Sequence, residues 1–221
     1  MVNGSSISKW VDLQAVGGDS NVTGGAGKQP TYTTPIQNGL GAVTYNPANS
    51  NNLDINPIAF AANKAGLTIY VVARPTTTPA TAFPLVVTDQ SMGVWWNGTN
   101  WSVGVTVGNR GTVTVTNDTT KFHMYGMVFD GSQTGNANRL KFNYDKVNQT
   151  LTYTGTIGAN VGSPAYFFFG GDSRAKGVSN TFFNTFMTGY IGEVLMWTQA
   201  LTPSELTGVQ NYLNSKWGLG L

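Results

Sequence analysis

The sequence predicts an all-β protein in which two antiparallel sheets pack as a sandwich, with one α-helix at about residues 203–217. Three observations favour this class. Short apolar or alternating runs recur between turn residues, which is typical of β-sandwiches. No regular alternation of strands and helices occurs, as a parallel sheet would need. The only clear helix signal follows the last strand-like run and predicts a helix packed on a sheet.

The last strand is predicted over residues 190–197, YIGEVLMW. Apolar residues occur on both of its faces, so we expect it to be largely buried. Strict alternation assigns its residues to two faces: Tyr190, Gly192, Val194 and Met196 on one, and Ile191, Glu193, Leu195 and Trp197 on the other.

The helix that follows has a complete set of start and stop signals. Thr202 is the expected cap, Pro203 suits the first helical position, and Glu205 completes a capping box. Gly218 supplies the stop. Apolar residues then form one stripe at helical spacing: Leu206, Val209, Leu213 and Trp217.

The other strands are shorter, and two stretches between them are predicted to be irregular. Residues 14–39 read as a long loop that packs on the sandwich or contacts a partner, and residues 46–66 as irregular with one helical turn near 58–63. Residues 140–144 and 150–154 are expected to pair as a hairpin around Asp145-Lys146. The predicted strands are residues 7–13, 41–45, 67–74, 84–88, 93–96, 101–107, 112–116, 122–129, 140–144, 150–154 and 165–170.

Composition limits the domain count and the partners. The 221 residues suit one domain, residues 1–221, because no linker divides them. Only 10% of residues are charged and the net charge is +2, so we expect no nucleic-acid partner. No apolar run approaches the roughly 20 residues that span a bilayer, and no secretory leader is visible. A virion surface or an extracellular location, reached by a route such as cell lysis, is therefore expected.

Several stretches resemble the laminin-G-like branch of the concanavalin A-like jelly rolls. They are SKWVDL with QPTYT and QNGLGAVTY, then VFDGSQTGNANRLKFNYDKVNQTLTYTGTI at residues 128–157, and the C-terminal GYIGEVLMW…LTPSEL…YL…KWGL. The resemblance implies a two-sheet jelly roll with one C-terminal helix. It also implies a module that binds glycans, proteins or neighbouring subunits on surface proteins and bacteriophage virions.

The chain departs from that family in two places. The inner hairpin turns on Asp145-Lys146 where Asn-Gly is usual, and Lys is disfavoured at positive φ, so a longer or different turn is expected. A usual strand before Trp10 is missing. One sheet is therefore expected to have an open edge, covered by a partner or by residues 14–39.

The sequence offers no catalytic residue. Glycoside hydrolysis needs two carboxyl groups within about 5–9 Å, and no two acidic residues lie closer in sequence than Asp12 and Asp19. Glu205 is better explained as a helix cap, and His123, in an apolar strand, as a structural histidine. We therefore predict a protein that is not an enzyme; a glycoside hydrolase or polysaccharide lyase ranks third among the functions considered.

No cofactor or metal site is predicted. The chain has no cysteine, which excludes disulfides and thiolate metal sites. Asp89, Asp130 and Asp172 are isolated loop acids, whereas calcium usually needs several carboxylates. A weak loop calcium site is the alternative to turn-capping aspartates, which we favour.

Aromatic and amide side chains are the remaining candidates for contacts. Trp96 and Trp101 share the core face, so Trp95 points outward and is predicted to stack on a sugar, with Asn97 and Asn100 beside it. A Trp95 packed under a loop is the equal alternative. The loop residues Phe182, Phe183 and Phe186 are partner-contact candidates, or a plug of the sandwich end.

Two functions follow, and both are non-catalytic. The first is a bacteriophage virion decoration or fibre-type protein whose partners are other virion or surface proteins, a second copy of the chain, and a glycan. The alternative is a carbohydrate-binding module of a bacterial surface or secreted protein, which reads a glycan through Trp95 and loop asparagines.

Overall fold

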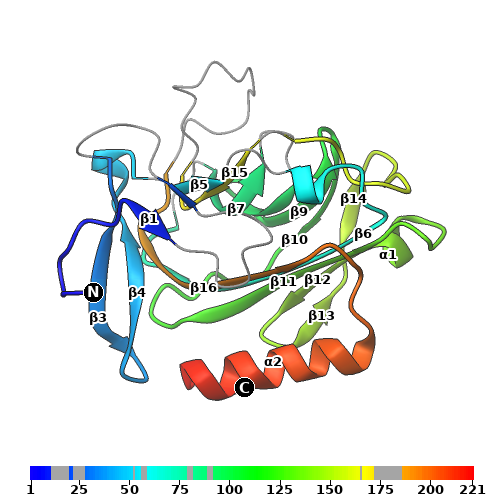
Figure 1. The fold of residues 1–221 in the computed structure, drawn as a ribbon. Helices are drawn as coiled ribbons and strands as arrows, with labels where there is room; N and C mark the ends of the chain where they lie inside the picture. Colours follow the sequence, from blue (N-terminus) through cyan, green and yellow to red (C-terminus); the bar gives the residue numbers. More distant parts are fainter. Residues whose placement is uncertain are drawn as a thin grey trace.

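The protein is a two-layered β-sandwich with a helix on one outer face (Figure 1). The fold is taken from a computed structural model that describes residues 1–10, 20–21, 28–51, 53–55, 59–78, 82–88, 92–164, 166–171 and 186–221. In the view of Figure 1, the C-terminal helix runs below a seven-stranded sheet, and a nine-stranded sheet lies above it.

The seven-stranded sheet contains the longest strands. Its order is β13-β12-β11-β6-β16-β4-β3, and its paired neighbours are antiparallel. The strands are β3 (Thr31–Gln37), β4 (Leu40–Tyr45), β6 (Gly66–Pro75), β11 (His123–Asp130), β12 (Leu140–Tyr144), β13 (Val147–Gln149) and β16 (Gly189–Trp197). Apolar residues on both faces of β6 and β11 explain their central position, because one face meets the other sheet and the other meets the helix.

The nine-stranded sheet is built from shorter strands in the order β1-β2-β5-β15-β7-β8-β9-β10-β14. They are β1 (Lys9–Trp10), β2 (Ser20–Asn21), β5 (Leu53–Ile55), β7 (Phe83–Thr88), β8 (Gly93–Trp96), β9 (Trp101–Thr106), β10 (Asn109–Val113), β14 (Thr152–Thr154) and β15 (Phe167–Phe169). The core between the sheets is largely aromatic: Trp101 packs edge-on against Phe83 and Trp96 and contacts Tyr125 of the opposite sheet.

The helix α2 (Pro203–Trp217) has the bounds that the sequence predicts. The Thr202 hydroxyl accepts from the Glu205 amide, and the Glu205 carboxylate accepts from the Thr202 amide at 2.7 Å. Gly218 ends the helix in a left-handed conformation. The other helical elements are α1 (Asn136–Arg139), the 3-10 turn η1 (Pro47–Asn49) and η2 (Ala59–Ala61), which falls in the predicted turn near 58–63.

Strand β16 differs from strict alternation because it contains a β-bulge at Gly192. Ile191 faces the inter-sheet core, and after the bulge Val194 and Met196 do so, whereas Tyr190 lies on the helix side. The prediction that Tyr190 shares a face with Val194 and Met196 is therefore wrong. A Cβ at Gly192 would lie 2.2 Å from the Trp217 ring, so the bulge lets the helix approach the sheet closely.

Two stretches predicted to be irregular contain strands. Residues 31–37, within the predicted loop 14–39, form β3 and pair with β4; their polar, Thr-rich composition and Pro35 hid a strand near the sheet edge. Residues 53–55 form the buried strand β5. Part of residues 14–39 thus forms the strand outside β4 in the seven-stranded sheet, whereas the open edge expected near Trp10 stays a prediction. Residues 4–7 lie beside this strand, since Gly4 and Ile7 donate backbone hydrogen bonds to Tyr32 and Pro30.

The hairpin after β12 is tighter than the sequence predicts. Tyr144 pairs with Val147, so the loop has two residues, and both have positive φ: 49° at Asp145 and 67° at Lys146. The expectation of a longer turn is wrong. Asp145 offsets the strain with its side chain, which accepts from the Met124 amide at 2.9 Å. The predicted pairing of 140–144 with 150–154 is also wrong, because residues 152–154 pair with β10 in the other sheet.

Candidate ligand-binding site

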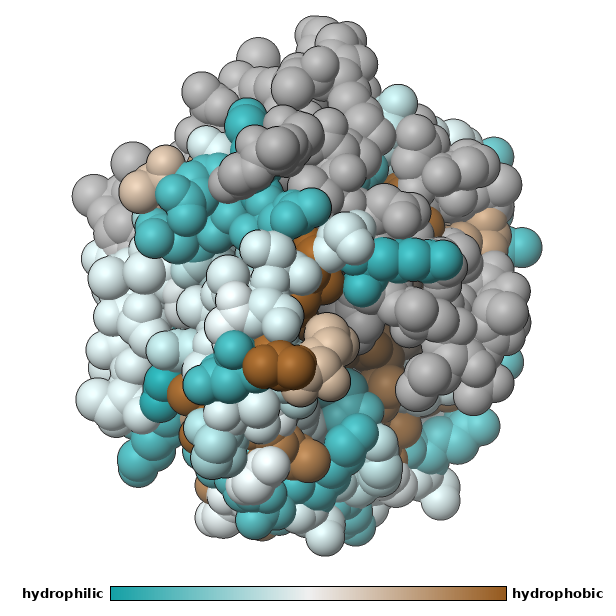
Figure 2. Space-filling model, turned by 60° about the vertical axis from the view of Figure 1, so that its left-hand side comes forward, coloured by the Kyte–Doolittle hydropathy of each residue, from teal (hydrophilic) through white to brown (hydrophobic). Residues whose placement is uncertain are grey.

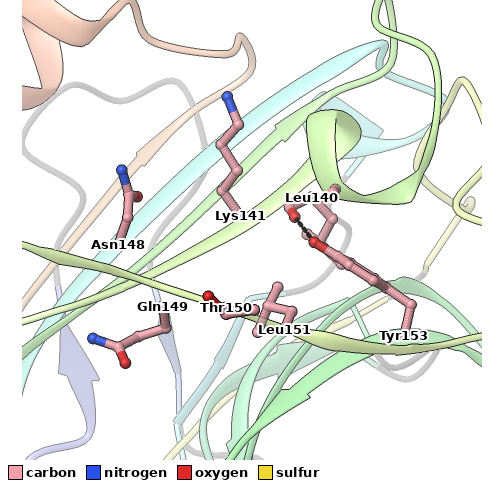
Figure 3. Close-up of a pocket in the computed structure, with 8 residues that line it drawn as sticks. Leu140, Lys141, Asn148, Gln149, Thr150, Leu151 and Tyr153 are labelled. Carbon is pink, nitrogen blue, oxygen red and sulfur yellow. Dashed lines mark hydrogen bonds between the residues drawn. The ribbon is translucent and has the colours of Figure 1, made fainter.

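A pocket of about 300 Å³ lies where the chain crosses from one sheet to the other (Figure 3). Strand β13 ends at Gln149 in the seven-stranded sheet, and β14 begins at Thr152 in the nine-stranded sheet. Thr150 and Leu151 make the crossing. The lining residues come from α1, β12, β13, β14 and this crossing: Ala137, Leu140, Lys141, Asn148, Gln149, Thr150, Leu151 and Tyr153.

The apolar part of the pocket is held rigidly. Leu151 packs against the core and occupies the space above Gly111 of β10, where a Cβ would lie 2.6 Å from it. The Tyr153 hydroxyl donates to the Leu140 carbonyl at 2.8 Å and so joins the two sheets. Burial raises the pKa of Tyr153 above its ordinary value.

The polar part of the pocket is uncommitted. Lys141 and Asn148 are exposed and, in Figure 3, extend in the same direction; Thr150 is exposed beside them. None of these three side chains forms a hydrogen bond or ion pair with a described residue, whereas Gln149 donates to the Val147 carbonyl. The lining therefore combines an ammonium, an amide and a hydroxyl with apolar side chains, a combination that binds polar small molecules. Lys141 and Asn148 lie on the helix side of the sheet, because Asn148 pairs with Asn143, whose side chain bonds Gln210, whereas Leu140 and Leu151 face the core between the sheets.

Sequence reasoning did not find this pocket. Its polar residues are common surface types, and its two walls belong to strands of different sheets. The available signal was the short interval between Tyr144 and Thr152, which is too short for two full strands and a turn in one sheet.

The predicted sugar platform at Trp95 is wrong. Trp95 points away from the inter-sheet core, as predicted, but it is fully buried, and it packs with Val87 and Ala82. A buried ring cannot stack on a ligand from solvent, so the alternative of a covered tryptophan holds.

Asn97 and Asn100 form the hairpin turn between β8 and β9. The Asn97 side-chain oxygen accepts from the backbone amides of Thr99 and Asn100, and its amide nitrogen donates to Ser102 at 3.1 Å. The Asn100 side chain accepts from the Thr114 hydroxyl. These bonds explain the two asparagines as turn-forming residues, and a ligand role for them stays a prediction.

The three predicted partner-contact residues are only partly described. Phe182 and Phe183 lie outside the described residues. Phe186 is half-buried and forms an isolated antiparallel bridge with Gly171. A Cβ at Gly171 would lie 2.3 Å from the Phe186 ring, so this ring packs against the chain itself.

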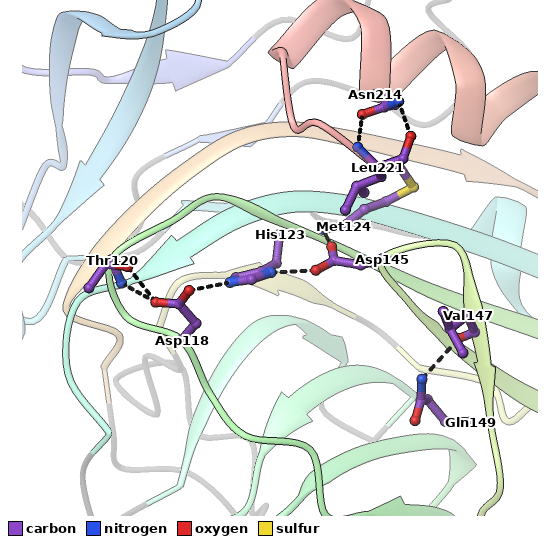
Figure 4. Close-up of polar contacts among 9 residues, drawn as sticks. All are labelled: Asp118, Thr120, His123, Met124, Asp145, Val147, Gln149, Asn214 and Leu221. Atoms are coloured by element: carbon purple, nitrogen blue, oxygen red, sulfur yellow. Dashed lines mark hydrogen bonds and ion pairs between the residues drawn. The ribbon is translucent and has the colours of Figure 1, made fainter.

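His123 belongs to a polar cluster at the start of β11 (Figure 4). Its Nδ1 lies 2.6 Å from the Asp145 carboxylate, and its ring stacks on Tyr144. Its Nε2 lies 3.9 Å from Asp118, whose pKa is lowered by hydrogen bonds from the Thr120 hydroxyl and amide. Because Asp145 forms the tight turn, this geometry fits the predicted structural role of His123.

The described carboxylates are engaged in structural contacts. Asp130, one of the calcium candidates, accepts from the amide and hydroxyl of Ser132, and these bonds lower its pKa. Asp89 and Asp172 lie outside the described residues. Glu193 accepts from Trp217 and Lys216, and Glu205 caps α2. Among the described residues, no group of three or more His, Asp or Glu side chains could hold a metal ion, and no carboxylate lines the pocket.

The described part of the surface in Figure 2 is mainly hydrophilic, with apolar residues in small groups. The described residues on this face therefore show no broad apolar patch of the kind that marks large protein interfaces. In the described part of the chain, no helix has the length and apolarity needed to cross a membrane.

Comparisons with known proteins place the fold. No family model and no curated protein sequence matches the chain. Among solved structures, the chain is similar to domain 4 of AbnA, an extracellular arabinanase from Geobacillus stearothermophilus in complex with arabinotriose. The TM-score is 0.60 at 13% identity over 95% of this chain and 100% of that chain.

Two further neighbours are longer proteins. A botulinum neurotoxin DC binding domain in complex with SialylT has a TM-score of 0.53 at 8% identity, over 95% of this chain and 51% of that one. Trypanosoma rangeli sialidase in complex with sialic acid has a TM-score of 0.57 at 11% identity, over 94% of this chain and 31% of the sialidase chain. At these identities the likeness is one of fold: the chain is a two-sheet antiparallel β-sandwich, and the laminin-G-like and phage assignments stay predictions.

Proposed function

We propose that the protein is a carbohydrate-binding module and that the pocket between β12, β13 and β14 holds the saccharide. The observation that carries the proposal is a pocket whose lining joins Lys141, Asn148 and Thr150, which have no partner among the described residues, to the apolar Leu140, Leu151 and Tyr153. A sugar presents hydroxyl groups on its rim and C–H groups on its ring faces. Amide, hydroxyl and ammonium groups form hydrogen bonds with the sugar hydroxyls, and aromatic and aliphatic side chains pack on the C–H faces of the ring.

The fold neighbours support this alternative over the virion function, because they are in complex with arabinotriose, SialylT and sialic acid. We also propose that the module is not catalytic, since its pocket has no carboxylate to serve as acid, base or nucleophile. Virion partners gain no support from these comparisons and stay a prediction.

A glycan array that carries neutral and acidic saccharides, followed by calorimetry on each hit, tests the proposal. Replacing both Asn148→Ala and Thr150→Val removes two uncommitted hydrogen-bonding groups, and we expect at least about a tenfold loss of affinity. Asn49→Ala, an exposed asparagine in η1, is the matched control and should change nothing.

An array without hits would refute the carbohydrate-binding function. A hit whose affinity survives the double substitution would place the saccharide elsewhere. Amide chemical shifts on titration separate these cases, because a ligand in the pocket perturbs residues 137–153 first.

A further inference from the structure

A row of side chains crosses four strands on the outer face of the seven-stranded sheet. Backbone pairing puts Thr31 of β3 opposite Thr44 of β4, Thr44 opposite Tyr190 of β16, and Tyr190 opposite Arg74 of β6. Directly paired residues project to the same side of a sheet. With strands about 4.8 Å apart, the row is about 14 Å long.

Arg74 is fixed at the end of this row by aromatic rings. Its guanidinium lies 4.5 Å from the centroid of Tyr190 and 5.3 Å from that of Phe122. Phe122 in turn stacks on Trp217, the last residue of α2, with centroids 5.6 Å apart. A side chain held between two rings has already lost its rotamer freedom, so it binds a partner at little further entropic cost.

The guanidinium has no polar partner among the described residues. No hydrogen bond or ion pair reaches it from them, and its Nε is buried without an acceptor. Glu193, on the same side of the sheet, is committed to Trp217, Tyr212 and Lys216. The hydroxyl of Tyr190 is likewise unbonded within the described part of the chain, and that of Thr44 bonds only Thr33. A buried donor without an acceptor is destabilising, and an anion that accepts from it would relieve this cost.

We infer that this row, Thr31, Thr44, Tyr190 and Arg74, binds an acidic saccharide through its carboxylate. The planar guanidinium donates two parallel hydrogen bonds to a carboxylate. The half-buried Tyr190 ring gives a sugar ring a surface to pack on, and the threonines offer hydroxyls to neighbouring units. A flat row of mixed aromatic and hydroxyl groups suits several pyranose units better than it suits a single acidic side chain of a peptide.

The inference rests on the proposed function for the saccharide class, but it uses different residues from the pocket. The first pair of probes, trigalacturonate and its fully methyl-esterified form, differs in charge on the same sugar chain. The second pair, 3′-sialyllactose and lactose, differs by one acidic sugar. We expect at least one acidic probe to bind about tenfold tighter than its neutral partner, and to weaken as salt is added.

Arg74→Gln should abolish the preference for the acidic probe, and Arg74→Lys should restore part of it, since a charge without the planar fork remains. Lys64→Gln removes one exposed positive charge before the other end of β6 and should leave the preference unchanged. Melting temperatures show which variants fold. If the Arg74→Gln protein does not fold, the affinity of the Arg74→Lys protein and the salt dependence of binding test the inference.

Each outcome is decisive. Equal affinity for the acidic and neutral probes, or a preference that survives Arg74→Gln, overturns the inference and leaves the pocket untouched. If the affinity for the acidic probe depends on Arg74 but is unchanged by Asn148→Ala with Thr150→Val, the inference is supported and the pocket is rejected as the saccharide site. If no saccharide binds and a peptide with acidic side chains binds through Arg74, both proposals are overturned.

Discussion

The outer face of the seven-stranded sheet has two halves that use polar groups differently. Under α2, the Gln210 amide donates to the Tyr70 hydroxyl at 2.9 Å and to Asn143 at 3.2 Å, and Glu193 accepts three bonds from the helix. Beyond the helix, Arg74 and Tyr190 direct no polar group to a described residue. Where its own helix covers the sheet, the chain satisfies these polar groups internally; beyond the helix, Arg74 and Tyr190 have no polar partner among the described residues.

Removing the ring that divides the two halves should have the largest effect. Trp217→Ala deletes a buried side chain that packs on Gly192 and Phe122 and donates to Glu193 at 2.7 Å. We expect a loss of about 3–5 kcal/mol in the free energy of unfolding, measured by urea denaturation. Trp217→Phe keeps most of the packing and should cost less; an equal cost would show that the bond to Glu193 dominates.

Filling the bulge should be the next most damaging change. Gly192→Ala adds a Cβ that meets the Trp217 ring at 2.2 Å, and we expect a loss of about 1–3 kcal/mol from overpacking. Gly208→Ala is the matched control, because nothing lies within 4 Å of its Cβ and alanine favours the helix. If both substitutions stabilise the protein, the close approach of helix and sheet is not the reason for the bulge.

Replacing Gln210 in the polar network under the helix should lower the free energy of unfolding, although the network is small. Gln210→Met keeps the volume but removes the donor to the buried Asn143 and to Tyr70, and should cost about 1–2 kcal/mol in thermal or urea unfolding. No loss would mean that water replaces the amide, and the contrast between the two halves would weaken.

Arg74→Gln should change the stability far less than it changes binding. Because Arg74 has no ion pair in the described structure, only its contacts with two rings are lost, and we expect less than about 1 kcal/mol. A loss as large as that of Gln210→Met would identify Arg74 as a structural residue.

The smallest effect concerns pH and the start of α2. Hydrogen bonds from the Thr202 amide and hydroxyl lower the pKa of Glu205 below 4.5. When folding lowers the pKa of a carboxylate, the group stabilises the folded state at pH values above its pKa in the unfolded state. This contribution disappears as the pH falls through the pKa that the group has in the folded state. Glu205→Gln keeps a capping side chain but does not titrate, so wild type should lose stability relative to it only below about pH 4.5. A difference that grows at neutral pH would contradict this assignment.

Much of the fold was predictable, because local signals and tertiary structure agree. The capping box at Thr202 and Glu205 and the apolar run of β6 each specify their element without outside contacts. The bulge at Gly192 was not predictable, since its cause is the ring of Trp217, 25 residues later in the chain. Strand β3 was missed because edge strands need no apolar alternation.

The binding surfaces depend on register, which the sequence does not display. Thr31, Thr44, Arg74 and Tyr190 become neighbours only when four strands align. The orientation of Trp95 followed from its neighbours, but its burial depends on packing outside its own strand. Residues chosen as ligand contacts for their type alone have other positions in the structure: Asn97 and Asn100 form a turn, and Trp95 is buried.

The crossing at Thr150 and Leu151 has a mechanical consequence. The walls of the pocket belong to both sheets, and the Tyr153–Leu140 bond already spans them. A ligand bound in the pocket would contact both sheets and hold them together. Ligand binding should therefore slow the exchange with solvent of the amide hydrogens of β14, which lies at the edge of its sheet.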